Sequence, residues 1–512
     1  LDELAQWGMQ KLAEAVDTSF ATHLGASKVY LVFNPLSFTR DALVELTQEP
    51  PLRGWQAYGP DGEPLLGQWS EEARRMLVRV NDLPPLGWTA VALVDGEITA
   101  SGGVRAEGMV LQNDLLRAEL DPQTGHLLSV VHKASGAEAI EPGRPANVIQ
   151  LYRERRNIYP AWNLDYDKYG SQPQTVDNAL SITVIEPGPV RTRIRIARSF
   201  EELYIEQDVI LDAGADHLRF ETRIDNWGEV ENRLAKVAFP LNLENAPAEA
   251  IYDIPYGTLV RRHDENPPYN YEALGHKWVA ILDSVAATPG RGVALLSRNK
   301  YGFDILNDRN AAGIHGGRAN ILRLTLLKAA QSPRLGNILA NRGGPIGDRG
   351  SFTAIYGLRP FSGDWAAARM PQAGWSFNMQ PPVVSTDSHG GALDPAGSWA
   401  IVEPDNVLIS ALKRPWDGPD SRSVVLRLHE VQGADTTVRL SLPGRRILSA
   451  EPLDLIERAV DGPSVTIDRS GACSLLLPAH SLATLLLRTQ PLGARDDDDD
   501  SQDQDERGCG CN

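Results

Sequence analysis

Apolar and polar residues alternate with a period of two along most of the chain, in short runs separated by Gly, Pro, Asn and Asp. Because successive side chains of a strand point to opposite faces, this alternation predicts β-strands. The clearest runs are Lys28–Phe33, Met109–Leu120, Thr192–Phe200, Leu218–Ile224, Ala235–Leu243 and Ile321–Leu327. A smaller series of strands is predicted between residues 406 and 488. Such spacing is typical of antiparallel sandwiches.

The N-terminal residues follow a helical period instead, which predicts a helix from Leu1 to about Leu24. One face of this helix carries Leu4, Gly8, Leu12, Val16 and Phe20. An apolar helix face needs a partner, and no second helix is predicted nearby, so we expect the partners upstream of Leu1. The predicted fold is mainly β: a large antiparallel β-sandwich and a small C-terminal β-sandwich, with a short N-terminal helix.

These patterns predict four segments. Residues 1–27 form a helical remnant, 28–385 a large β-sandwich region, 386–490 a small C-terminal β-sandwich and 491–512 an acidic tail. The stretch 358–382 is rich in Pro, Gly and Trp, and we predict a linker or long surface loop there. The run of aspartates in the tail predicts disorder, since like charges repel and bury no apolar area.

The first strand is interrupted by Asn34 and Pro35 before a second apolar run begins at Ala42. Pro35 lacks a ladder donor and favours an extended or turn conformation at Asn34. The Asn34 side chain can close such a turn by a local hydrogen bond. We therefore predict a corner between layers, with a structural rather than catalytic role for both residues.

Composition narrows the class of protein. The net charge of −17 and a pI of about 5.1 argue against a nucleic-acid partner, which calls for a basic surface. No apolar stretch approaches the roughly 20 residues of a membrane helix, and no signal peptide is visible. Only three cysteines occur, two of them in the last four residues. We therefore expect a reducing compartment and a cytoplasmic location.

Motifs of catalysis are not recognisable from spacing alone. The sequence contains no GxGxxG, P-loop, HExxH or GxSxG pattern, and its histidines are scattered. The adjacent His263 and Asp264 would point apart on a strand, so we assign no metal ligand and no catalytic residue. A pair of carboxylates of the glycosidase type meets only in the fold.

Seven blocks, in order, resemble the β-rich C-terminal half of glycoside hydrolase family 38, the α-mannosidases. They are VFNPLSFTR, LQNDLLRAELDPQTGHLLSVVHKASGAEAI, LYRERRNIYPAWNLDYD, HLRFETRIDNWGEVENRLAKVAFPLNL, GVALLSRNKYGFDI, DRGSFTAIYGLRPFSGDW and RLHEVQG. One block departs from the family pattern, because Ser351 stands where a His is usual. The resemblance extends from about Leu1 to Arg488.

The resemblance implies that the chemistry lies in an N-terminal α/β domain upstream of a three-helix bundle. That domain supplies a zinc site with a His-x-Asp motif and a nucleophilic Asp, and this sequence contains no His-x-Asp. It implies a retaining mechanism on α-mannoside oligosaccharides, with zinc held by the catalytic domain and by no residue of this chain. We expect the missing catalytic half as a partner, a possible homo-oligomer, and no hydrolysis by this chain alone.

By the same resemblance, loops of the β half help to close the sugar cleft. Our candidates for substrate binding are Tyr256, Arg261 and Arg262, in the segment YDIPYGTLVRRHDENPPY. Trp162 and Asp165 are weaker candidates. The bland interpretation is that Tyr256 packs in the sheet and the arginines are solvated. The alternative function is a stand-alone carbohydrate-binding or protein-interaction module without enzymatic activity, because fold alone does not decide function.

Overall fold

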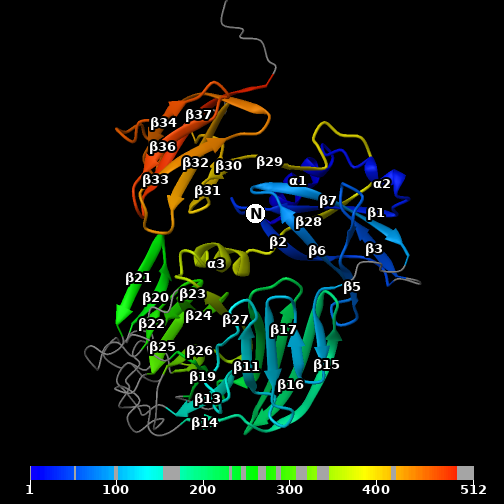
Figure 1. The fold of residues 1–512 in the computed structure, drawn as a ribbon, viewed down its shortest axis with the longest axis vertical. Coiled ribbons are helices and arrows are strands. Elements are labelled where there is room, and N and C mark those ends of the chain that lie inside the picture. Colours follow the sequence, from blue (N-terminus) through cyan, green and yellow to red (C-terminus); the bar gives the residue numbers. More distant parts are fainter. Residues whose placement is uncertain are drawn as a thin grey trace, which may run out of the picture. The chain divides into compact units, whose positions relative to one another are not determined.

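The structure is a computed structural model that describes residues 2–50, 54–96, 102–153, 173–229, 233–243, 249–262, 272–283, 290–306, 320–330, 345–416 and 422–492. The chain divides into two units, Leu1–Ser398 with Val431–Gly433 and Trp399–Glu430 with Ala434–Asn512. Antiparallel strands make up most of both units (Figure 1). The predicted mainly β fold with a short N-terminal helix is confirmed. The sequence-based boundary after residue 385 lies earlier than this division, and the acidic tail from 493 onward lies outside the described residues.

The N-terminal helix is shorter than predicted. The first helix, α1 (Asp2–Ala13), ends at Ala13, and a short second helix, α2 (Phe20–His23), follows after a break. In the break, Asp17 N–H donates to Leu393 O at 2.7 Å, and Thr18 Oγ1 donates to Asp387 O at 2.8 Å. The single helix from Leu1 to Leu24 is therefore wrong, because these residues bond to a distant segment instead of to their own helix.

A six-stranded and a three-stranded sheet form the first sandwich. The six-stranded sheet contains β28 (Val383–Thr386), β1 (Lys28–Asn34), β7 (Gly87–Asp95), β3 (Trp55–Tyr58), β4 (Pro64–Leu65) and β29 (Ala396–Ser398). The three-stranded sheet contains β2 (Arg40–Leu46), β6 (Arg75–Leu83) and β5 (Gly67–Ser70). Tyr30 and Val32 of β1 pack in the core between the sheets. Val29 and Leu31, on the opposite face of β1, pack in a cluster with Ala13 and Val16 of the N-terminal segment.

The predicted corner at Asn34 is present between β1 and β2. Its Oδ1 accepts the Leu36 N–H at 3.1 Å, and its Nδ2 donates to Phe38 O and Pro84 O, each at 2.9 Å. The side chain is buried. Asn34 therefore closes the turn that Pro35 begins, and its role here is structural.

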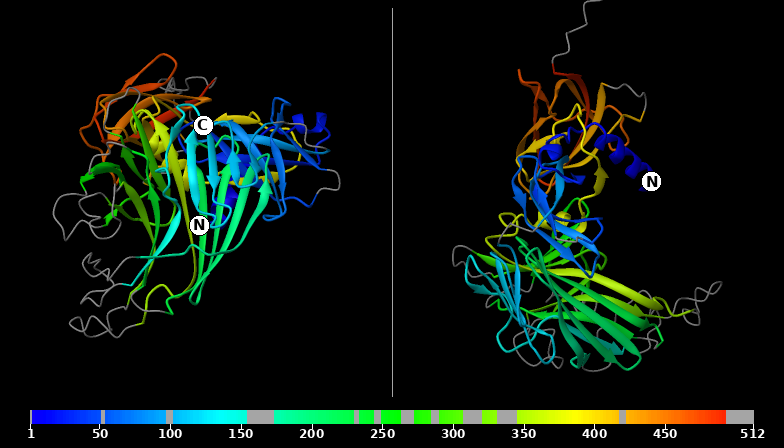
Figure 2. Two further views of the ribbon diagram at one scale, coloured as in Figure 1. Left: turned by 60° about the horizontal axis from the view of Figure 1, so that its bottom comes forward. Right: turned by 90° about the vertical axis from the view of Figure 1, so that its right-hand side faces the viewer.

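Three sheets surround the largest core. The nine-stranded sheet runs in the order β15 (Ala179–Pro187), β16 (Arg191–Phe200), β17 (Leu203–Asp212), β18 (Leu218–Trp227), β27 (Gly350–Ser362), β24 (Arg291–Ser297), β23 (Trp278–Leu282), β20 (Glu249–Ile254) and β21 (Gly257–Arg262). The six-stranded sheet runs in the order β14 (Gln174–Thr175), β13 (Val148–Arg153), β19 (Arg233–Pro240), β26 (Ile321–Ala329), β25 (Gly302–Leu306) and β22 (Ala273–Leu274). The five-stranded sheet contains β12 (Ala137–Glu138), β11 (Leu127–His132), β10 (Leu116–Leu120), β9 (Val110–Gln112) and β8 (Arg105–Glu107). One continuous cluster, including Leu111, Ile196 and Phe239, joins all three sheets. The long strands β15 to β18 run side by side (Figure 2).

The predicted linker at 358–382 is wrong. Its first residues end strand β27, which lies in the middle of the nine-stranded sheet between β18 and β24. Its later residues form helix α3 (Met370–Asn378), whose Met370 and Phe377 pack on Trp278 and Phe361 of the same sheet. The Pro, Gly and Trp residues that hid the pattern fit these elements, since Pro371 stands in the first turn of the helix, where its missing N–H costs nothing.

The second unit is a small sandwich of two four-stranded sheets. One contains β30 (Ile401–Glu403), β33 (Thr436–Ser441), β36 (Cys473–Leu477) and β35 (Thr466–Ile467). The other contains β31 (Val407–Lys413), β32 (Ser423–Glu430), β37 (Leu482–Pro491) and β34 (Arg445–Leu453). Leu426, Leu440 and Leu485 are fully buried within it.

Candidate functional site

The predicted substrate-binding residues lie on the hairpin β20–β21, and β21 is the edge strand of the nine-stranded sheet. Tyr256 occupies the turn of this hairpin with a φ of 57°, and its side chain is exposed. A positive φ is uncommon for a residue with a large side chain. The exposed side chain therefore does not support the purely structural interpretation, in which Tyr256 packs in the sheet.

Arg261 differs from Tyr256 because it is partly buried. It is paired across the hairpin with Ala250, which belongs to the large core, and its guanidinium carbon lies 5.5 Å from the centroid of the Tyr252 ring. Its Nε is buried and makes no hydrogen bond. A guanidinium over an aromatic face is held by a cation–π interaction. Arg261 is thus partly buried, and one of its donor atoms is buried without a hydrogen-bond partner.

The remaining candidates are not tested by the structure. Arg262 belongs to β21, but its side chain lies outside the described part. Trp162 and Asp165 lie in the undescribed range 154–172, directly after β13. These three residues stay predictions.

A buried polar network lies on the six-stranded sheet that contains β13, β19, β26 and β25, on the face that points away from the large core. The sequence pattern did not reveal it. Lys236 of β19 points away from the large core, since its neighbours Ala235 and Val237 belong to that core. Its Nζ lies 2.5 Å from Glu272 Oε2 and 2.8 Å from Asp304 Oδ2, and donates to Thr325 Oγ1 at 2.7 Å.

Arg323 of β26 extends the network across the sheet. Its Nε and Nη2 donate to the two oxygens of Asp304 at 2.6 and 2.8 Å, a bidentate pair. Its Nη1 donates to Tyr152 OH, and the Tyr152 hydroxyl donates to Gln150 Oε1 at 3.0 Å. Two cations and two carboxylates thus balance each other in a buried setting.

The electrostatics of the network follow from these pairs. Burial alone would lower the pKa of Lys236, but Asp304 and Glu272 outweigh it, so the pKa lies above its ordinary value. Burial alone would raise the pKa of Asp304, but Arg323 and Lys236 outweigh it, so that pKa is lowered. Both shifts favour the charged forms of Lys236 and Asp304, so neither group is set up to exchange a proton near neutral pH. The network therefore has a structural role: through Tyr152 and Gln150 it ties β13 to the neighbouring strands of the sheet.

A signal for this network exists in the sequence. Lys236, Asp304 and Arg323 are each single charged residues inside runs that are otherwise apolar. Charged side chains in such runs are rarely buried without partners. Three such charged side chains, one on each of three strands, can pair with one another only when the strands are neighbours in a sheet.

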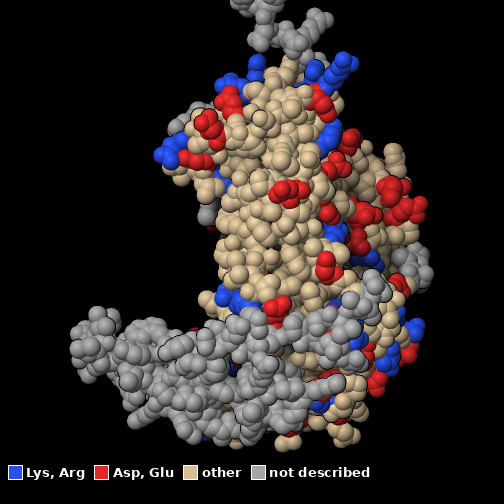
Figure 3. All heavy atoms as spheres, turned by 60° about the vertical axis from the view of Figure 1, so that its left-hand side comes forward, with Lys and Arg blue, Asp and Glu red and all other residues tan. Residues whose placement is uncertain are grey.

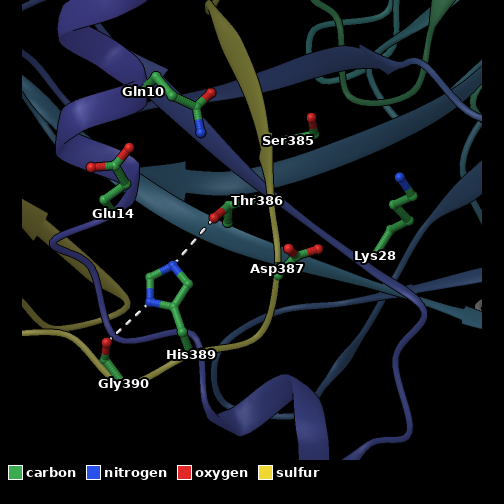
Figure 4. Close-up of a pocket in the computed structure, with 8 residues that line it drawn as sticks. All are labelled: Gln10, Glu14, Lys28, Ser385, Thr386, Asp387, His389 and Gly390. Atoms are coloured by element: carbon green, nitrogen blue, oxygen red, sulfur yellow. Dashed lines mark hydrogen bonds between the residues drawn. The ribbon is translucent and has the colours of Figure 1, made fainter.

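A pocket of about 590 Å³ lies beside α1 and the segment after β28 (Figure 4). Its charged side chains have both signs, Glu14 and Asp387 against Lys28. His389 Nδ1 lies 3.0 Å from Gly390 O and must donate to it, so Nε2 of the neutral ring accepts from Thr386 Oγ1 at 3.2 Å. Both ring nitrogens are engaged, and the pocket presents no free base in His389.

Positive and negative residues are interspersed on the face that Figure 3 shows, and its described part has no continuous basic patch. In the described ranges, no group of three or more His, Cys, Asp and Glu side chains is arranged to hold a metal ion. Zinc binding by a catalytic domain outside this chain stays a prediction. None of the described helices has the length and hydropathy needed to span a membrane.

The residues that carry the sequence blocks have structural roles in this geometry. Asn113 Oδ1 accepts the backbone N–H of Leu116 at 2.8 Å, and its Nδ2 donates to Ala215 O at 2.8 Å. Lys133 Nζ donates to Asn113 O at 2.5 Å. In the last block, Glu430 is fully buried and accepts from Asn406 Nδ2 at 3.0 Å and His480 N at 2.9 Å.

Comparison with family models decides the assignment. Residues 111–335 match "Glycosyl hydrolases family 38 C-terminal domain", and residues 406–477 match "Glycosyl hydrolases family 38 C-terminal beta sandwich domain". The chain belongs to the C-terminal region of glycosyl hydrolase family 38. The first match falls in the first unit of this family 38 chain and the second match, apart from Val431–Gly433, in the second unit.

Curated relatives agree with this family. Alpha-mannosidase 2C1 from Homo sapiens is 30% identical over 392 residues, which cover 75% of this chain and 34% of the human protein. Alpha-mannosidase 2C1 from Mus musculus is 28% identical over 357 residues, which cover 68% of this chain and 31% of the mouse protein. The family 38 chain thus spans about a third of the length of the curated relatives it matches.

A solved structure shares the fold of the family 38 chain. An alpha-mannosidase from Enterococcus faecalis V583 superposes with a TM-score of 0.70 at 16% identity, covering 95% of this chain and 58% of that one. At this identity the match supports the arrangement of sheets over both units and not the details of a site.

Proposed function

We propose that this chain serves as the C-terminal part of an α-mannosidase, a retaining glycoside hydrolase, and that the residues which cleave the α-mannoside lie in a catalytic domain outside it. The observation that carries the proposal is the match of two family 38 C-terminal domains, in order, to the two units of the fold. The α-mannosidases among its relatives are about three times as long as the matched part.

Within such an enzyme, the hairpin β20–β21 would help to close the sugar cleft. Its support is the exposed Tyr256 ring at the turn and the buried, unbonded Nε of Arg261 beside Tyr252. An aromatic face suits the apolar face of a pyranose, and a guanidinium suits its hydroxyls or a carboxylate of the catalytic domain. Arg262 is the third candidate at this position.

The partners follow from the same proposal. They are an α-mannoside oligosaccharide, the N-terminal catalytic half, which would hold the zinc, and further copies of this chain in a homo-oligomer. The cytoplasmic location remains a prediction from the cysteine usage.

Activity assays test the proposal. The purified 512-residue chain should not hydrolyse an aryl α-mannoside with or without added zinc, whereas a protein that joins it to its N-terminal domain should, with no turnover of the matching aryl β-mannoside. Zinc-dependent turnover by the 512-residue chain alone would contradict the placement of the catalytic residues. An inactive joined protein would instead favour the stand-alone binding or interaction module.

A further inference from the structure

The C-terminal unit has an exposed aromatic surface of its own. Trp416 follows β31 and is 84% exposed. Its backbone N–H donates to Glu457 Oε2 at 2.8 Å, which brings it against the turn after β34. That turn presents Leu455 and Ile456, which are 59% and 70% exposed. We call Trp416, Leu455 and Ile456 the Trp416 patch.

The patch rests on a fixed support. Asp454 Oδ1 accepts the backbone N–H groups of Ile456 and Arg458, each at 2.9 Å, which closes the turn. Glu457 has a φ of 67°, and its carboxylate pairs with Lys413 Nζ as well as with the Trp416 backbone. A non-glycine residue with positive φ is held by its surroundings. The turn is therefore ordered before any ligand arrives, which lowers the entropic cost of binding.

Arg427 joins this support from the neighbouring strand β32. Its Nη2 donates to Leu455 O at 3.1 Å, and its Nε donates to Thr484 Oγ1 at 3.1 Å. Arg427 is the first residue of the block RLHEVQG. The proposed function gives this block no role other than a structural one. The position of Arg427 places a guanidinium under the same turn that carries the apolar side chains.

The charges of the patch favour a neutral ligand. Lys413 pairs with Glu457, and Arg458 Nε lies 2.7 Å from Asp454 Oδ2, so opposite charges compensate each other around the turn that carries Leu455 and Ile456. A pyranose has an apolar face of C–H groups and a rim of hydroxyls. An exposed indole complements the C–H face, and the polar groups of the adjoining turn suit the hydroxyls. A protein partner of ordinary stability needs about 800 Å² on each side, which is more than three side chains present.

We propose that the Trp416 patch is a surface binding site for neutral oligosaccharides, in which the Trp416 ring stacks on a sugar and the Lys413–Glu457–Arg427 group borders its hydroxyls. The site lies in the small sandwich and needs no catalytic residue. It therefore does not depend on the α-mannosidase proposal, and binding is measured without turnover.

Affinity electrophoresis of the intact chain in gels that contain α-mannan, β-glucan or galactan tests this site. At least one polysaccharide should retard the chain, and Trp416→Ala should weaken the binding about 10-fold or more, equal to about 1.4 kcal/mol. Trp416→Phe should bind with intermediate strength. Trp7→Ala is the matched control, because Trp7 is also exposed, at 61%, but lies on α1. An unchanged melting temperature should show that each variant folds.

Three results would overturn the proposal. The first is passage of the chain through all three gels without retardation. The second is binding of Trp416→Ala as tight as that of the parent. The third is a dimer in sedimentation that Trp416→Ala converts to a monomer, which would make the patch a contact between copies of this chain.

Discussion

At the scale of single residues, the ammonium group of Lys236 is fully buried, and its partners Glu272, Asp304 and Thr325 come from separate parts of the chain. A buried charge is tolerated only when its partners replace the water it has lost. Removing one charged side chain of the network therefore leaves its partners buried without a counter-charge. The resulting loss of stability exceeds the net stabilisation that the ion pair itself contributes.

Lys236→Met should lower the free energy of unfolding by about 3–5 kcal/mol, because the carboxylates of Glu272 and Asp304 lose their shared cation. Urea unfolding monitored by circular dichroism measures this loss. Lys11→Met is the control, since Lys11 pairs with Glu14 on the surface at 2.7 Å and should cost less than about 1 kcal/mol. Similar losses in both variants would mean that the network contributes no more than a surface pair.

The lowered pKa of Asp304 predicts a dependence of stability on pH. Because the folded pKa lies below that of an unfolded aspartate, about 4, the folded state binds this proton less readily. The stabilisation that ionised Asp304 contributes is complete above the pKa of an unfolded aspartate. It is lost as the pH falls through the pKa of Asp304 in the folded state. Between pH 6 and pH 3, urea midpoints of Asp304→Asn should fall less steeply than those of the parent. Parallel curves would exclude Asp304 as a source of the acid sensitivity.

The two adjacent arginines of the hairpin should differ. In the assembled enzyme, replacing one of Arg261 and Arg262 by Ala should lower kcat/KM about 10-fold or more, equal to roughly 1.4 kcal/mol, and replacing the other should change it little. Adjacent strand residues face opposite sides, so only one can reach a shared cleft. Melting temperatures of both variants separate a loss of turnover from loss of the Arg261–Tyr252 contact. Equal, negligible effects would make the hairpin a scaffold.

The sequence predicted candidates for substrate binding, and their role stays a prediction. Residue types and the family resemblance led to Tyr256 and Arg261, because aromatic and guanidinium groups are the usual partners of sugars. They did not lead to Lys236, Asp304 and Arg323, because alternation treats a lone charged residue in a strand as solvent-facing. Only the order of the strands β19, β26 and β25 shows that these charges meet.

At the scale of elements, prediction succeeded where a strand has one period and failed where tertiary contacts decide. The run Leu218–Ile224 is part of β18 and the run Ile321–Leu327 is part of β26. The run Met109–Leu120 is two strands, β9 and β10, because Asn113 closes a turn between them. The N-terminal helix breaks before Thr18 because residues about 370 positions away supply the hydrogen-bond partners of this segment.

The corner at Asn34 gives a test at this scale. Asn34→Ala should destabilise the protein by about 1–3 kcal/mol, because the carbonyl groups of Phe38 and Pro84 and the N–H of Leu36 lose a buried partner. Chemical unfolding measures the change. Asn81→Ala, at an exposed position of β6, should have an effect within about 0.5 kcal/mol. A neutral Asn34→Ala would mean that Pro35 alone fixes the corner.

At the scale of the whole molecule, the chain has two units with separate cores. Multidomain chains often unfold in more than one step, so a single melting temperature does not describe them. The two family models fall on these units one by one, which agrees with separate structural modules.

Leu426→Ala should therefore lower one calorimetric transition selectively. Leu426 is fully buried in the small sandwich, and its truncation should cost that unit about 2–5 kcal/mol. Leu295→Ala, in the core of the large unit, is the matched variant and should lower the other transition. One common transition that shifts equally in both variants would show that the two units unfold as one.

The position of β27 also sets an order of events during synthesis. Strand β18 ends at Trp227, but its neighbour β27 begins only at Gly350, about 120 residues later. At about 5–20 residues per second, a ribosome needs on the order of 6–25 s to deliver that strand. Until then the half-built sheet keeps an open edge beside an apolar face, the kind of surface that captures other nascent chains. Slow codons between the two strands would lengthen this interval, and a holding chaperone would be needed most while this part of the chain is emerging.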